Sequence, residues 1–85
     1  MKKIEREIRG IPFFLIVEYL EEMGGILIKD GYVQGPGWNV SLERIEPFRI
    51  GSLEVGQSRV NFEIDDHLVD EFMEIFSKKT LRAGG

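Results

Sequence analysis

Apolar residues recur every three or four positions in two parts of the chain, which predicts two amphipathic helices. The first begins at Pro12, whose missing N–H is not needed in the first turn of a helix, and continues to Met23. Two glycines at 24–25 provide its exit. The second helix carries an apolar stripe over residues 68–76, and one of the two aspartates at 65–66 is expected to cap its start.

Alternation of apolar and polar residues predicts strands around these helices. Residues 3–9 alternate before the first helix, and the clearest alternation in the chain begins at Trp38. Pro47 is expected to interrupt pairing because proline cannot donate to a sheet ladder, and Gly56-Gln57 is expected to form a turn. Asp30-Gly31 indicates either a tight turn or a bulge. The strands predicted between the helices cover residues 26–33, 38–43, 48–55 and 60–64.

This pattern predicts an α+β fold in the order β-α-β-β-β-β-α. Two amphipathic helices and a run of antiparallel strands bury their apolar sides most simply as one twisted sheet with both helices packed on one face. The opposite face stays in water, and a groove between sheet and helices is the expected place for a ligand. We expect residues 1–79 to form a single domain and residues 80–85 to form a flexible C-terminal tail ending in Gly-Gly.

The composition of the 85-residue chain excludes several kinds of chemistry. With 42% apolar and 31% charged residues it is an ordinary globular domain, and its net charge of −4 argues against nonspecific nucleic-acid binding. The absence of cysteine excludes disulfides, thiolate metal sites and a cysteine nucleophile. The single histidine, His67, has no nucleophile motif to act on, and the nearby carboxylates lack the spacing of a calcium loop. We therefore expect a protein that is not an enzyme and that holds no metal or cofactor.

Hydropathy gives no sign of a membrane segment. The longest apolar stretch, residues 11–17, is far shorter than the roughly 20 residues that a membrane-spanning helix needs. The first residues lack the apolar region of a signal peptide. We therefore expect a cytoplasmic protein with no membrane partner.

The last residues, Arg82, Ala83, Gly84 and Gly85, are the candidate site for binding a protein partner. Glycine has no Cβ, so a terminal glycine pair makes a thin and flexible strand that can enter a narrow active-site channel. Ubiquitin-like proteins and sulfur carriers use such an end for adenylation of the terminal carboxylate. In the body of the chain, Arg6 and Trp38 are candidates to line a groove, and Trp38 is alternatively an anchor of the core.

Three segments carry a resemblance to a known family: Gly-Pro-Gly-Trp at 35–38, Arg-Ile-Gly-Ser-Leu at 49–53 and Lys-Thr-Leu-Arg-Ala-Gly-Gly at 79–85. Together with the order of elements, they make the chain similar to the C-terminal domain of proteins related to the small, sulfur-carrying subunit of molybdopterin synthase. That resemblance implies a TBP-like (helix-grip-like) fold and a link to molybdenum or tungsten cofactor assembly. In those relatives the domain follows a ubiquitin-like β-grasp domain, whereas this sequence has one strand before its first helix.

Three functional hypotheses follow from these observations. The leading one is a non-enzymatic accessory module whose tail docks into a partner enzyme, either the large subunit of molybdopterin synthase or an adenylating enzyme. One alternative is a domain that binds a small molecule in the groove. Another is a structural module that forms homo-oligomers through the wide apolar arc at Phe14, Leu15 and Tyr19.

Overall fold

The computed structural model describes the backbone of residues 1–84 and the side chains of residues 1–81. It contains five strands and two α-helices, with a short 3-10 helix, η1, before the second α-helix. Their bounds are β1 Lys2–Arg9, α1 Phe13–Glu22, β2 Ile26–Lys29, β3 Tyr32–Gly35, β4 Trp38–Ile50, β5 Leu53–Ile64, η1 Asp66–Leu68 and α2 Val69–Gly84.

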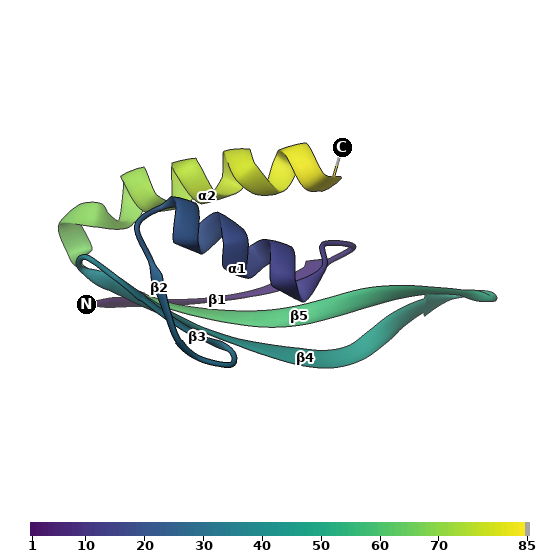
Figure 1. Cartoon of the computed structure of the whole chain (residues 1–85). Helices are drawn as coiled ribbons and strands as arrows, with labels where there is room; N and C mark the ends of the chain where they lie inside the picture. The colour runs from purple at the N-terminus through teal and green to yellow at the C-terminus, as the bar shows by residue number, and fades with distance from the viewer. Residues whose placement is uncertain (85) are drawn as a thin grey trace.

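The strands form one antiparallel sheet in the order β1-β5-β4-β3-β2, and both α-helices lie on the same side of it (Figure 1). The α+β class and the single sheet are therefore confirmed. α2 packs Phe72 and Phe76 edge-on against Phe62 of β5, with ring centroids 5.7 and 5.1 Å apart. α1 contacts β2 and β3 and buries Ile16 and Leu20 completely. The two helices thus cover neighbouring parts of one sheet face.

The alternation in β4 and β5 separates the core face of the sheet from its water face. Val40 pairs with Phe62 and Leu42 pairs with Val60, and all four side chains are buried. Ser41, between the two core positions of β4, is exposed. The period of two in these strands therefore predicted correctly which side chains face the helices.

The hairpin of β4 and β5 is longer than the sequence pattern predicted. β4 continues past Pro47, where the register with β5 shifts, so the proline lies in an irregular part of the ladder that needs no N–H from it. The turn follows β4 at Gly51, whose φ of +60° suits glycine. Gly56-Gln57 remains inside β5, and Gln57 pairs with Arg9 of β1. The predicted interruption at Pro47 is thus confirmed as a break in pairing at residues 46–47, although β4 itself continues, whereas the predicted turn at Gly56-Gln57 is wrong.

The start of α2 has no carboxylate cap from Asp65. The Asp65 side chain makes no capping hydrogen bond, and Asp66 instead lies 3.6 Å from the N-terminal ammonium of Met1. The backbone carbonyl of Asp65 accepts a 2.8 Å hydrogen bond from the Leu68 N–H, which closes the 3-10 turn. The prediction that Asp65 or Asp66 caps this helix through its carboxylate is therefore wrong over the described residues, because the backbone closes the turn without either side chain.

The end of α2 lies beyond residue 79, where the sequence pattern placed the boundary between domain and tail. The helix includes the backbone of residues 80–84, and the Thr80 hydroxyl donates to the Ser77 carbonyl at 3.0 Å. Leucine and alanine at positions 81 and 83 have high helix propensity, which favours this continuation. Gly85 lies outside the described residues. Neither helix, over the residues that the structure describes, is long and apolar enough to cross a membrane.

Candidate functional site

The indole of Trp38 is packed between two glycines and the ring of Phe72. Only 5% of Trp38 is exposed. A Cβ at Gly25 would lie 2.6 Å from the indole, and a Cβ at Gly35 would overlap it. On the helix side the Phe72 ring meets the indole edge-on, with centroids 5.0 Å apart. Trp38 is therefore an anchor that joins the sheet to α2.

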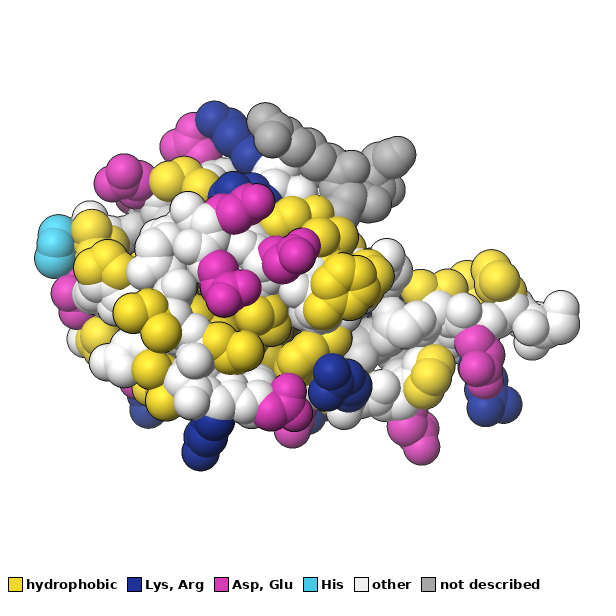
Figure 2. Space-filling model, in the orientation of Figure 1, with side chains coloured by type: hydrophobic (Ala, Val, Ile, Leu, Met, Phe, Trp, Pro, Cys, Tyr) yellow, Lys and Arg dark blue, Asp and Glu magenta, His cyan; other side chains and the backbone are white. Residues whose placement is uncertain are grey.

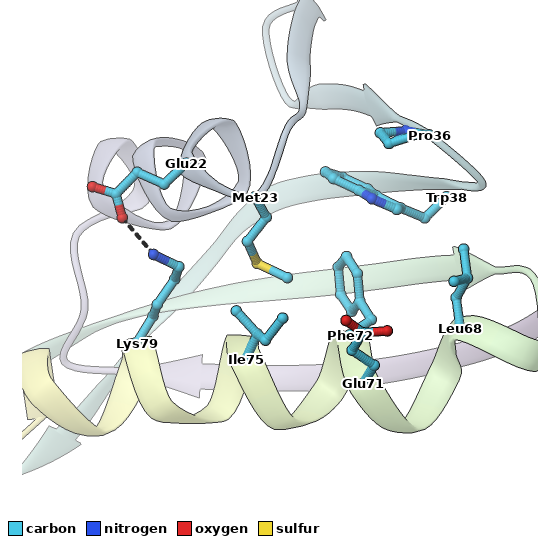
Figure 3. A pocket seen from close by; sticks show the side chains of 9 residues that line it. All are labelled: Glu22, Met23, Pro36, Trp38, Leu68, Glu71, Phe72, Ile75 and Lys79. Carbon is cyan, nitrogen blue, oxygen red and sulfur yellow. Dashed lines mark hydrogen bonds and ion pairs between the residues drawn. The ribbon is translucent and has the colours of Figure 1, made fainter.

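An apolar groove of about 410 Å³, called the Trp38 groove below, lies beside this indole, where the end of α1 approaches α2. Trp38 and Phe72 line it, and Figure 3 shows Met23 and Ile75 pointing toward each other across it. Met23 comes from the end of α1, whereas Ile75 lies on the exposed part of the α2 surface. The groove therefore needs both helices and the first residue of β4 in place.

An ion pair closes one end of the groove. Lys79 Nζ of α2 donates to Glu22 Oε1 of α1 at 2.7 Å, and only 22% of the Lys79 side chain is exposed (Figure 3). Glu71 lies on the rim and makes no ion pair with any other described side chain. The groove thus combines an apolar interior with carboxylates at its edge.

The Lys79→Gln variant tests whether this ion pair holds α2 against α1. We expect a loss of about 0.5–1 kcal/mol in the free energy of unfolding at low salt, which disappears near 1 M salt because charges are screened there. Amide hydrogen exchange should accelerate in the last turns of α2. The matched control is Lys78→Gln, since the partner of Lys78 among the described residues is Glu74 of the same helix, at 3.1 Å. Equal exchange rates in the two variants would show that the Lys79 pair does not join the helices.

Arg6 does not lie in the Trp38 groove. It is exposed and lines a second hollow of about 380 Å³ between β1 and α2, together with Phe76 and Thr80. Its partner in the sheet is Val60, so its Cα lies in a core-facing row near the edge of the sheet. The sequence-based candidates Arg6 and Trp38 therefore belong to two separate hollows.

The candidate tail residues are described only in part. The backbone of Arg82, Ala83 and Gly84 belongs to α2, while their side chains and all of Gly85 lie outside the described residues. Thr80 and Leu81, which precede them, line the hollow beside Arg6. The tail therefore starts next to the second hollow.

Sequence reasoning missed the residues that complete the groove. Leu68, Phe72, Ile75 and Lys79 recur at helical spacing and form one stripe of η1 and α2 along it. That stripe is visible in the sequence, but nothing in the sequence indicates that Met23 lies opposite. The three residues of the apolar arc on α1 differ in burial. Phe14 is 65% exposed, whereas Leu15 and Tyr19 pack partly against the core.

The described side chains form no constellation with the geometry of a metal site. No group of three or more histidine, aspartate or glutamate side chains comes together within residues 1–81 to hold a metal ion. His67 is exposed in η1.

The family model of the archaeal MoaD-like proteins matches residues 4–85, which is nearly the whole chain and includes the terminal glycine pair. No curated protein matches the sequence. The matched segment contains β1 from its third residue onward, the other four strands, both α-helices and the groove between them. The chain therefore belongs to the archaeal MoaD-like family.

Proposed function

We propose that this chain is a non-enzymatic accessory module of molybdenum or tungsten pterin cofactor biosynthesis, and that it presents its Gly84-Gly85 end to a partner enzyme. The observation that carries the proposal is the match to the MoaD-like family, which extends through residue 85 and so includes both glycines. A TBP-like fold, consistent with the order of elements, and a cytoplasmic location are parts of the same proposal.

The proposed chemistry is activation of the carboxylate at the glycine end. An adenylating partner transfers AMP from ATP to this carboxylate with release of pyrophosphate. Hydrosulfide released from a sulfur donor then displaces AMP and leaves a thiocarboxylate. When its sulfur is transferred on the large subunit of molybdopterin synthase, water attacks the acyl carbon and restores the carboxylate. Glycine suits the last two positions because a Cβ would widen a strand that has to enter a narrow channel.

The helical end of α2 must open for this proposal to work. The last four carbonyl groups of a helix lack partners within it, so helix ends open at little cost. Gly84 favours opening further, because glycine is about 1 kcal/mol less favourable than alanine in a helix. On leaving the helix, residues 80–84 would extend from about 1.5 Å to about 3.3 Å per residue. The sequence at the end of α2 is therefore compatible with a helix that unwinds on docking.

Deletion of Gly84 and Gly85 tests the proposal. We expect the shortened chain to lose binding to the adenylating enzyme and to the large subunit of molybdopterin synthase by at least about tenfold, or 1.4 kcal/mol. Mass spectrometry of the full chain incubated with ATP, the adenylating enzyme and a sulfur donor should show replacement of one oxygen by sulfur. The shortened chain should show none.

A second variant keeps the length of the chain. Replacing both glycines with alanine retains the carboxylate but adds two Cβ atoms, so slower activation without loss of folding is expected. Intact mass of the protein purified from its own cells establishes whether the natural chain ends at Gly85. Unchanged binding of the shortened chain to both partners, or a full chain that gains no sulfur, would rule out the proposed role.

A further inference from the structure

The charges of this molecule are divided unequally between its two layers. The helical layer, taken as residues 13–22 and 65–81, carries eight acidic and only two basic side chains. The remaining described part, residues 1–12 and 23–64, carries seven acidic and eight basic side chains. Figure 2 shows acidic side chains gathered over the helices, around apolar ones. The excess negative charge of the molecule therefore lies on the helical face.

The Trp38 groove opens on this acidic face. Its interior is apolar, and Ile75 remains 40% exposed at its edge, so this side chain is open to contact with another molecule. Its volume of about 410 Å³ lies at the lower end of the range of about 300–1,000 Å³ found for ligand sites. This is enough space for a few apolar side chains, but not for a folded domain.

The rim of the groove carries negatively charged side chains, which favour a positively charged partner. Glu71 makes no ion pair with another described side chain, and Glu22 has one carboxylate oxygen 2.7 Å from Lys79. Both belong to the groove lining. A second copy of this chain is a poor occupant, because it would bring the same acidic surface against itself, and like charges repel at an interface. A basic partner with apolar side chains can fill the groove and place positive charges against the carboxylates of its rim.

We propose that the Trp38 groove binds a basic segment of a partner protein, which inserts apolar side chains between Met23 and Ile75 and pairs lysine or arginine side chains with Glu71 and Glu22. The apolar contact gives affinity, and the charges on the helical face accelerate association and select against acidic partners. The described residues that line the groove lie between positions 22 and 79, and the proposal uses none of the tail residues, so it does not depend on the function proposed for the tail.

A titration with short synthetic peptides tests this inference. The probe is an acetylated and amidated peptide in which Leu-Phe is flanked on both sides by Lys-Arg, and the comparison peptides replace the basic residues with glutamate or the Leu-Phe pair with serine. Trp38 is the only tryptophan, so its fluorescence reports on the groove directly. We expect the basic peptide to shift this fluorescence with micromolar to millimolar affinity and the two comparison peptides to leave it unchanged.

Matched variants separate the groove from overall charge. Glu71→Lys should weaken binding of the basic peptide by at least about tenfold, whereas Glu46→Lys, an equal change of charge on an exposed β4 residue, should weaken it less than about twofold. Ile75→Asn should also weaken it, and Ile50→Asn at the tip of the hairpin, where Ile50 is 60% exposed, should not. The chain without Gly84 and Gly85 should bind as well as the full chain.

Three results would overturn the proposal. The first is no response of Trp38 to millimolar basic peptide, and the second is equal weakening by Glu71→Lys and Glu46→Lys, which would mean nonspecific attraction. The third is a dimer in sedimentation that Ile75→Asn converts to a monomer, because the groove would then hold a second copy of this chain.

Discussion

Replacing Phe62 with alanine is expected to lower the free energy of unfolding by about 3–5 kcal/mol. Phe62 is 1% exposed near the end of β5, where it pairs with both β1 and β4, and its ring packs edge-on against Phe72 and Phe76 of α2. The substitution removes a buried ring, leaves a cavity and deletes two aromatic contacts. A domain of this size is stabilised by about 4–13 kcal/mol in total, so a large part of its stability would be lost. Urea unfolding followed by circular dichroism measures the change.

The matched control is Phe14→Ala, the same substitution on the outer surface of α1. Phe14 is 65% exposed, so the loss should stay within about 0.5 kcal/mol. The control also bears on the hypothesis of homo-oligomers through α1, because sedimentation of this variant would reveal a dimer that depends on Phe14. Similar losses for Phe14→Ala and Phe62→Ala would show that the three-ring contact does not hold α2 to the sheet.

The importance of Phe62 was visible in the sequence, because periodicity alone identifies core positions. Val60, Phe62 and Ile64 alternate with polar residues, and the structure buries all three. The apolar stripe on α2 likewise predicted Phe72 and Phe76 as its core-facing residues. Period-two and period-3.6 patterns are local, so they establish which side of an element is buried without information on its neighbour.

The errors in the sequence analysis arose where local signals were weighed without their pairing context. Pro47 interrupts the pairing as predicted, yet β4 continues beyond it with a shift in its register against β5. Gly56 resembles a turn residue, yet pairing of Arg9 with Gln57 continues the sheet there. Such long-range pairing energies outweigh the propensity of a single residue. Four strands lie between the helices, but they are not the four segments that the pattern predicted.

The location of the groove could be predicted from the sequence, but the residues that line it could not. A space between helices and sheet follows from the fold class, and Trp38 was one of its expected residues. Arg6, the other candidate, lines a separate hollow, and the sequence did not identify Met23 and Lys79 as residues of the groove. Which residues meet across a groove depends on the relative placement of α1 and α2. That placement is determined by side-chain packing between distant segments, such as the contact of the Trp38 indole with the Phe72 ring of α2.

Gly35→Ala tests whether this indole packing shapes the groove. A Cβ at position 35 would overlap the Trp38 ring, and Gly35 is the residue that pairs with Trp38 in the ladder between β3 and β4. Pairing prevents the two strands from separating, so the indole has to move. Forcing extra atoms into a packed core typically costs about 1–3 kcal/mol, and displacement of a 5% exposed tryptophan places this variant at or above about 3 kcal/mol. Trp38 fluorescence should shift to longer wavelength, and a soluble quencher should reach the ring more readily.

The matched control is Gly56→Ala in β5. Position 56 has no positive φ and no atom within 4 Å of an added Cβ, so the new methyl group meets open space. Because alanine loses less backbone freedom on folding than glycine, this variant should be unchanged or more stable by up to about 1 kcal/mol. Opposite signs for the same glycine-to-alanine change in one sheet would show that steric contact with Trp38, not strand propensity, requires glycine at position 35. If both variants instead retained the stability and Trp38 emission of the original chain, the indole would not be held between β3 and α2 as the structure places it.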